Sequence, residues 1–249
     1  MKVLFLGTNG WYDTGTGNTI CTLIKANEAT VILDAGNGLH KLNGHIAPDE
    51  DRPFYLFLSH FHLDHIVGLH LLNMFSFPGE LVIGGPSGSR DILNRVVNRP
   101  FTAALSELSY ETTVLELPEE EDRLRIEVEA RPLLHPDLTI GFRMRLDGKV
   151  ITYCPDTGYC ENAVYLSRNA DLVIAECAYR SGESSETWPH LNPETAAAIA
   201  LEAGAKRLVL THFDASLYTT PAVRKESEKA ARGIFRNTVA AMDDMEIDV

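Results

Sequence analysis

The sequence predicts an α/β fold with four layers, an α/β/β/α sandwich in which two packed β-sheets carry helices on both outer sides. Three observations support this prediction. Strand-rich segments occur in both halves of the 249-residue chain, each half also contains helical patterns, and no linker or repeat separates the halves. Two such halves bury their apolar faces when the sheets pack together and the helices cover them. We expect one domain over residues 1–249.

The first half alternates short apolar segments with turn residues. Strands are predicted over residues 2–6, 19–25, 30–34, 54–58 and 81–83. The run 54–58 is apolar throughout, which is typical of a strand that is buried on both faces. Apolar residues that recur on one helical face predict a helix over 64–75, and a second helix is expected near 89–97.

The second half repeats the pattern. Strands are predicted over residues 123–134, 140–146, 149–153, 172–175 and 207–210. Asp147-Gly148 is typical of a hairpin turn between two of them. Asn192 and Pro193 mark a helix start, and the alanine-rich segment 195–203 forms its body. The acidic tail after Ala241 is expected to be frayed or to lie on the surface.

The overall charge bears on possible partners. With 22 Lys and Arg against 35 Asp and Glu, the net charge is −13. Binding along a nucleic acid needs many basic side chains, so we expect no extended nucleic-acid partner. A small anionic substrate stays compatible, because bound metal ions supply local positive charge. No apolar run is long enough for a membrane helix, the N-terminus lacks a signal-peptide pattern, and the four cysteines are expected to be free thiols. These features predict a cytoplasmic protein without a membrane partner, and a homo-oligomer is compatible with them.

Four predicted strands each end close to a residue that can bind a metal ion. These residues are His60 after 54–58, His135 after 131–134, Asp156 after 150–154, and His212 after 208–210. Strand ends that lie together at one mouth of a sandwich would bring these groups close to one another. Polar groups on loops at rigid strand ends are where binding chemistry is commonly found.

The densest cluster is His60-Phe61-His62-Leu63-Asp64-His65. Two histidines two positions apart in an extended segment point the same way and can hold one ion. Asp64 and His65 then open the following helix and can reach a second ion. Imidazoles and carboxylates without a thiolate suit zinc, manganese or iron. An open site of this composition is typical of catalytic metal centres.

With these residues in place, the sequence resembles the metallo-β-lactamase superfamily, and within it the tRNase Z-like branch of ribonuclease Z and PhnP-like phosphodiesterases. Segment 33–36, with Asp34 and Gly36, resembles the strand-end Asp-x-Gly that supports the metal loop, and segment 60–65 matches the hallmark motif. Segments 190–195 and 206–213 are also similar to that branch. The resemblance implies two Zn²⁺ ions, or Mn²⁺ or Fe. It assigns His60, His62 and His135 to one ion, Asp64, His65 and His212 to the other, and Asp156 as the bridge.

The resemblance also implies catalytic roles. Asp64 would orient the nucleophile, and His190 would stabilise or protonate the leaving oxygen. Glu176 would support His190. The segment Ala175-Glu176-Cys177-Ala178 keeps the glutamate of the branch's HEAT motif but not its histidine. A structural role for His190 near a helix start is the alternative interpretation.

One departure from the branch affects the expected substrate. True tRNase Z enzymes carry a long arm between the third and fourth metal motifs, whereas residues 136–155 suffice only for a hairpin. Together with the acidic charge, this predicts a binuclear hydrolase that acts as a phosphodiesterase on a small phosphodiester or nucleotide-like molecule. Two alternatives keep the same site: a hydrolase of carbonyl esters such as lactones, thioesters or β-lactams, and a non-catalytic metal-binding protein.

Overall fold

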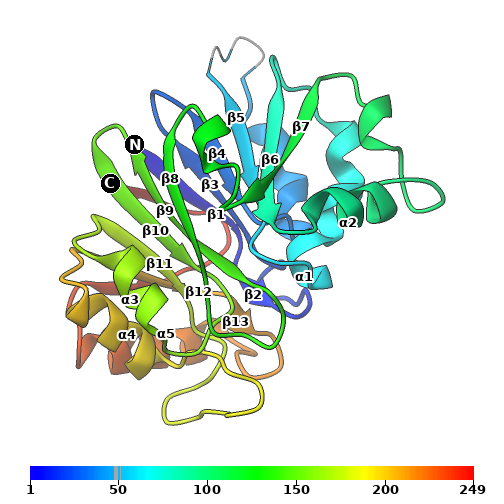
Figure 1. Ribbon diagram of the computed structural model, residues 1–249. Coiled ribbons are helices and arrows are strands. Elements are labelled where there is room, and N and C mark those ends of the chain that lie inside the picture. Colours follow the sequence, from blue (N-terminus) through cyan, green and yellow to red (C-terminus); the bar gives the residue numbers. More distant parts are fainter. Residues whose placement is uncertain (48–49, 51) are drawn as a thin grey trace.

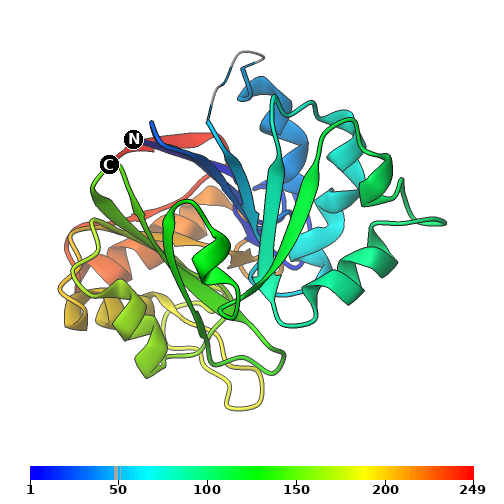
Figure 2. The same cartoon turned by 45° about the horizontal axis from the view of Figure 1, so that its top comes forward.

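A computed structural model describes residues 1–47, 50 and 52–249. Two β-sheets pack face to face, and helices cover the outer side of each (Figure 1). After a rotation of 45°, the two termini still lie close together at one end of the sheets (Figure 2). The four-layer α/β/β/α sandwich predicted from the sequence is therefore confirmed.

The first sheet has seven strands in the order β15-β1-β3-β4-β5-β6-β7. Their bounds are β1 Lys2–Gly7, β3 Cys21–Lys25, β4 Thr30–Leu33, β5 Phe54–Phe57, β6 Leu81–Pro86, β7 Thr112–Leu117 and β15 Met245–Asp248. Strands β4 to β7 run parallel to one another, so their carboxyl ends meet at one edge. The outer side is covered by η1 (Asn37–Gly44), α1 (Leu63–Ile66), η2 (Val67–Met74) and α2 (Ser89–Val96).

The second sheet has six strands in the order β14-β12-β11-β10-β9-β8. Their bounds are β8 Glu127–Pro132, β9 Ile140–Leu146, β10 Lys149–Cys154, β11 Leu172–Glu176, β12 Leu208–Thr211 and β14 Thr238–Ala240. The helices α3 (Glu161–Ser167), α4 (Pro193–Glu202) and α5 (Pro221–Arg232) pack on its outer side. Two short 3-10 turns, η3 (Leu105–Glu107) and η4 (Glu121–Arg123), flank β7.

Alternating apolar side chains place the main core between the two sheets. Phe57 of β5 stacks on Phe142 of β9 with ring centroids 5.2 Å apart, and Tyr153 of β10 is buried beside them. Two further apolar clusters lie under the helices on the outer sides. Burying one such side chain contributes roughly 1.5–3 kcal/mol, so these contacts fix the relative position of the two sheets and of the loops at their ends.

The predicted helix over residues 64–75 is wrong in type. Only Leu63–Ile66 is α-helical, and the 3-10 helix η2 follows. The reason is a competing set of backbone bonds: the carbonyl of His65 accepts from Ala35 N at 2.8 Å, and Gly68 N donates to Ala35 O at 2.7 Å. A Cβ on Gly68 would lie 2.3 Å from the carbonyl oxygen of Gly36. Segment 60–68, which carries four of the predicted metal ligands and is called the metal loop below, is thus bonded to the end of β4. It does not form one long α-helix.

The acidic tail was expected to be frayed or to lie on the surface, and it is ordered as an edge strand with Glu246 and Asp248 exposed, so only fraying is wrong. Residues Met245–Asp248 form β15, which pairs antiparallel with β1. Just before it, the carboxylate of Asp243 accepts from Thr8 Oγ1 at 2.7 Å, Asn18 N at 2.9 Å and Lys41 Nζ at 3.0 Å. The tail therefore completes the first sheet. Within the residues that the structure describes, no helix has the length and apolar character needed to cross a membrane.

The carboxyl ends of β4 to β7 in the first sheet and of β8, β10, β11 and β12 in the second lie at the same end of the sandwich. A short parallel pair, β2 (Asn9–Gly10) and β13 (Phe213–Asp214), lies there and ties the two halves together. Figure 1 shows β2, β13 and α1 at this end. The loops after β5, β8, β10 and β12, which carry the predicted metal ligands, therefore open onto the same region.

Candidate metal centre

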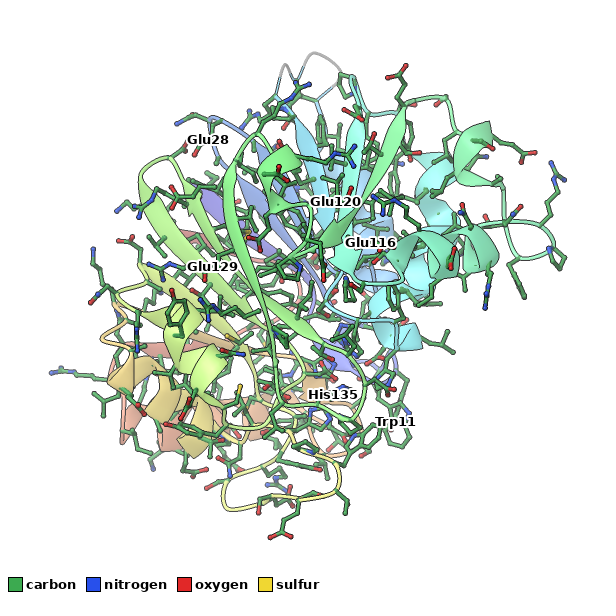
Figure 3. All side chains as sticks on the ribbon, in the orientation of Figure 1. Trp11, Glu28, Glu116, Glu120, Glu129 and His135 are labelled. Carbon is green, nitrogen blue, oxygen red and sulfur yellow. The ribbon has the colours of Figure 1, made fainter. Side chains whose placement is uncertain are left out.

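The structure brings all seven predicted metal ligands together. His60, His62, His135 and Asp156 each offer one ligand atom, and these atoms lie within 4.8 Å of one another. Asp64, His65 and His212 form a second group by the same measure. Figure 3 labels His135 and Trp11, and both lie toward the same end of the molecule in that view. The residues that follow the predicted strands were expected to meet at one end of the sandwich, and their side chains are neighbours in space.

Asp156 connects the two groups. Its Oδ1 lies 3.1 Å from His65 Nε2 and 3.2 Å from His212 Nε2, and its Oδ2 lies 3.9 Å from His60 Nε2. Asp64 Oδ2 is 3.3 Å from His212 Nε2. One carboxylate that faces nitrogen atoms of both groups has the position that a ligand shared by two cations requires.

Unpaired polar atoms support a metal pair. His60 Nε2, His135 Nε2 and Asp156 Oδ1 are buried, and none has a hydrogen-bond partner among the described residues. A buried polar atom without a partner costs about 1–3 kcal/mol, and cations bound at these lone pairs would remove that cost. The imidazole and carboxylate donors fit divalent zinc, manganese or iron.

The electrostatics of the site agree with this fit. Burial and the neighbouring His65 lower the pKa of His60 to about 2, so its ring is neutral and able to coordinate. Burial also lowers the pKa of His65, but Asp156 and Asp34 outweigh it and hold that pKa well above its usual range. An excess of carboxylate at this position favours positive charge, which a divalent cation supplies.

Asp34 fixes the orientation of the metal loop from below. It follows β4 with a φ of 57° and is fully buried. Its carboxylate accepts from Ser59 N at 2.7 Å, Ser59 Oγ at 2.9 Å and Tyr153 hydroxyl at 2.6 Å. His65 Nδ1 lies 2.8 Å away. Because a carboxylate only accepts, His65 donates from Nδ1 to Asp34, which leaves Nε2 as the atom that can coordinate a cation.

The β2 loop holds the second group from the other side. Trp11 N donates to Asp64 Oδ2 at 2.6 Å, and Trp11 has a φ of 74°. A Cβ on Gly10 would lie 2.5 Å from His212 Cε1, so glycine is needed for this close approach. His212 itself has a φ of 51°. Left-handed backbone in non-glycine residues is typical of functional sites held by their surroundings.

The first group is oriented by the loop after β8. His62 Nε2 lies 2.9 Å from Asp137 Oδ2, and His135 Nδ1 lies 3.0 Å from Thr139 Oγ1. Trp188 stacks on His62 with ring centroids 5.9 Å apart and planes 7° apart. Asp137 was missed by sequence reasoning, although its position two residues after a predicted ligand was an available signal.

His190 and Glu176 form a pair beside the metal ligands. Glu176 ends β11, is fully buried, and accepts from Thr157 N at 2.6 Å and Ala178 N at 3.0 Å. His190 Nδ1 lies 2.6 Å from Glu176 Oε1. Burial lowers the pKa of His190, but the Glu176 carboxylate outweighs this and raises it to about 9. The His190 ring lies 5.7 Å from the His135 ring.

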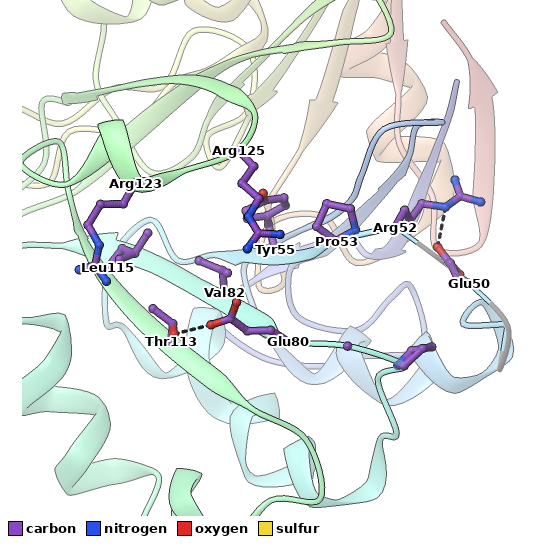
Figure 4. Close-up of a pocket in the computed structure, with 12 residues that line it drawn as sticks. Glu50, Arg52, Pro53, Tyr55, Glu80, Val82, Thr113, Leu115, Arg123 and Arg125 are labelled. Carbon is purple, nitrogen blue, oxygen red and sulfur yellow. Dashed lines mark hydrogen bonds and ion pairs between the residues drawn. The ribbon is translucent and has the colours of Figure 1, made fainter.

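A cavity of about 400 Å³ opens above the ligands. Its lining residues are Gly10, Trp11, His62, Asp64, Asp156, Ala178, Tyr179, Trp188, His190, His212 and Asp214. A larger cavity of about 600 Å³, bordered by Tyr55, Arg123 and Arg125, lies at the amino ends of β5 to β7 and contains none of the predicted site residues (Figure 4). The cavity of about 400 Å³ is the candidate site because predicted metal ligands and His190 line it.

Comparison with known proteins agrees with the fold and the site. The Beta-lactamase superfamily domain matches residues 29–213. Ribonuclease Z of Geobacillus kaustophilus is 28% identical, over 98% of this chain and 97% of the relative, and ribonuclease Z of Methanosarcina acetivorans is 26% identical, over 100% and 98%. The alignment with the Geobacillus protein extends over 304 positions, so that relative has segments that this chain lacks.

Solved structures extend the comparison. The short form of human tRNase Z superimposes with a TM-score of 0.76 at 26% identity, covering 100% of this chain and 99% of that one. A metallo-beta-lactamase fold protein from Bacillus subtilis gives 0.79 at 23% identity, covering 99% and 98%. A diphosphatase from the PhnP family gives 0.71 at 15% identity, covering 100% and 97%.

The prediction that confined the partners to small molecules and excluded extended nucleic acid is wrong. Relatives named ribonuclease Z match this chain along nearly its whole length. The short form of human tRNase Z also does so, and both are about equally identical to this chain. The reasoning failed because the net charge of a whole chain does not report the field at one site, and because the short segment between His135 and Asp156 does not close the cavity at the predicted metal ligands. The chain belongs to the beta-lactamase superfamily, in its tRNase Z-like branch, and is a metal-dependent hydrolase.

Proposed function

We propose that this chain is a binuclear metal-dependent phosphodiesterase that hydrolyses a P–O bond in RNA or in a nucleotide phosphodiester. The observation that carries the proposal is the pair of ligand groups joined by Asp156, with His190 held beside them by Glu176. In this proposal His60, His62 and His135 hold one Zn²⁺, and Asp64, His65 and His212 hold the other. Mn²⁺ and Fe are alternative ions.

The proposed ions supply two effects when bound: they lower the pKa of water, and they neutralise charge that develops on the phosphoryl oxygens. The chain provides the positioning. Asp64 is fixed by the Trp11 amide, so its carboxylate can orient the attacking water. His190, with its pKa raised to about 9, carries a proton at neutral pH. Since Nδ1 is engaged with Glu176, its Nε2–H is the group that can protonate the leaving oxygen.

The walls of the cavity support a substrate that contains nucleobases. Trp11, Tyr179 and Trp188 line it together with the metal ligands. Trp11 is 67% exposed and Trp188 is 47% exposed, so both rings have faces that are open to a ligand. Stacking of a base on an aromatic side chain contributes about 1–3 kcal/mol and tolerates different sequences. The names of the ribonuclease Z relatives support RNA as the substrate class.

The test compares bond types on purified, zinc-loaded protein. The substrates are bis(p-nitrophenyl) phosphate, a precursor tRNA with a 3′ extension, a chromogenic β-lactam and a thioester. We expect turnover of the phosphodiester and cleavage of the RNA, both lost on chelation and recovered when zinc returns. The His62→Ala variant is the control for contaminating nucleases. Turnover of the β-lactam or the thioester alone would overturn the proposal.

A further inference from the structure

A second cavity of about 330 Å³ adjoins the metal centre. It lies beside the start of α2 and the loop after β8. Besides His62, its walls are four apolar residues and two polar ones, namely Phe61, Pro86, Ile92, Leu138, Ser87 and Asp137. Leu138 is 52% exposed and forms part of the rim.

His62 is the shared wall between the two cavities, since it lines both. A ligand in the second cavity would therefore contact the His62 ring, whose other side lines the first cavity. Ligand pockets commonly measure about 300–1,000 Å³, so each of these cavities has room for one arm of a substrate. A phosphodiester has two arms on one phosphorus, and a phosphate held at the metal centre would direct one arm into each cavity.

The chemistry of the second cavity selects the kind of arm. No lysine or arginine is among the described residues that line it, and Asp137 contributes a carboxylate. A second phosphate is therefore disfavoured. Flat apolar contact is available from Phe61, Ile92 and Leu138. The contact with His62 uses Asp137 Oδ2, which leaves Oδ1 to accept from a ligand N–H. An aromatic ring that carries N–H groups, as nucleobases do, meets both conditions.

We propose that this cavity binds the base of the nucleoside that stays on the phosphate after cleavage. The inference rests on the proposed phosphodiesterase function. His190 lies in the first cavity, so the leaving arm lies on that side and the retained arm lies beyond His62. In the reaction, the P–O bond to the leaving arm breaks, water supplies OH to phosphorus, and the leaving oxygen takes a proton. The retained arm is then released as a nucleoside monophosphate.

Two esters with the same leaving group isolate the retained arm. They are thymidine 5′-(p-nitrophenyl phosphate) and methyl p-nitrophenyl phosphate, and the measured quantity is the ratio of their kcat/KM values. We expect the zinc-loaded protein to favour the thymidine ester at least tenfold. Ile92→Trp, which fills the cavity, and Leu138→Ser, which removes an apolar wall, should each reduce this ratio at least tenfold, mainly through KM. Leu201→Ser changes an equally exposed leucine of α4 outside both cavities and should leave the ratio unchanged.

The outcomes separate the subsite from the proposed function. If both cavity variants keep the natural ratio of kcat/KM values, including the case in which activity on both esters falls equally, the subsite is refuted while the phosphodiesterase activity stands. If the protein hydrolyses neither these esters nor the precursor tRNA, the proposed function fails. The subsite is then tested by calorimetric binding of thymidine 5′-monophosphate to the zinc-loaded protein. A Kd that rises at least tenfold in Leu138→Ser supports the subsite, and an equal Kd in both proteins refutes it.

Discussion

Replacing Asp34 with asparagine tests how the metal loop is held. The carboxylate accepts from the Ser59 amide through Oδ1 and from His65 Nδ1, the Tyr153 hydroxyl and Ser59 Oγ through Oδ2. The asparagine side chain would present one oxygen and one NH₂ in the same space. In either orientation of the amide, its NH₂ faces an N–H donor, that of the Ser59 backbone or that of His65. The hydroxyls can rotate, but these two N–H groups cannot.

The magnitude follows from this conflict. If the NH₂ faces His65, the imidazole proton moves to Nε2, the atom that the proposed ion would need for coordination. The metal-bound form must therefore adopt the other orientation, in which the buried Ser59 N–H has no acceptor. Leaving a buried donor unpaired costs about 1–3 kcal/mol, which corresponds to a loss in metal affinity of about fivefold to 150-fold. Losses of this size are typical when a residue that orients a metal ligand is changed.

Zinc titration against a competing chromogenic chelator, with elemental analysis for the number of ions per chain, measures this effect. We expect two tightly bound ions in the natural protein and one weakened ion in Asp34→Asn, the one assigned to Asp64, His65 and His212. Tyr153→Phe is the matched control, because it removes one bond to the same oxygen without adding a donor, and it should retain both ions. If Asp34→Asn binds both ions as tightly as the unmodified protein does, the proposed role of Asp34 in setting the His65 tautomer is refuted.

Four further changes test other parts of the site. His62→Ala should lose one of the two zinc ions and all turnover of bis(p-nitrophenyl) phosphate, as measured by elemental analysis and absorbance. His190→Ala should keep both ions and slow RNA cleavage by about 10²–10⁴-fold, with a smaller effect on p-nitrophenyl esters, whose leaving group needs no proton; loss of metal would contradict its assigned role. Because Glu176 raises the pKa of His190 to about 9 against the effect of burial, the protonated form and the RNA cleavage rate should decline above about pH 9, and Glu176→Gln should move this limb of the pH–rate profile to lower pH. Arg224→Met should lower the free energy of unfolding in urea by about 1–3 kcal/mol for each buried acceptor left unpaired, since Arg224 is fully buried and donates to Thr8 Oγ1 and the Ala241 carbonyl.

The clustering of the candidate metal ligands was predictable because their signals are local. His60, His62, Asp64 and His65 lie within six residues, at spacings that serve two ions. The other candidates each follow a short apolar strand, and parallel strands bring such ends to one edge of a sheet. The packing of the two sheets was predictable for a similar reason, since the apolar faces leave few other arrangements.

The supporting contacts were less predictable because they depend on residues far apart in sequence. Tyr153 lies in a strand whose residues are mostly buried, and nothing local indicates that its hydroxyl reaches Asp34. The apolar pattern of residues 64–75 fits an α-helix, whereas bonds from His65 and Gly68 to Ala35 impose a tighter winding. The pairing of the acidic tail with β1 likewise needs a partner at the other end of the chain. Periodicity describes one segment at a time and carries no information about such competition.

The error about nucleic acid has the same physical origin. A net charge of −13 is distributed over the whole chain, and surface charges are screened within roughly 8–10 Å at ordinary ionic strength. At the cavity, the carboxylates of Asp64 and Asp156 face the imidazoles, and two divalent cations would outweigh both carboxylates. The local charge presented to a phosphate would then be positive although the molecule is acidic. Attraction of a polyanion to this site would depend on the bound metal, and the acidic surface would limit only contacts made farther along the strand.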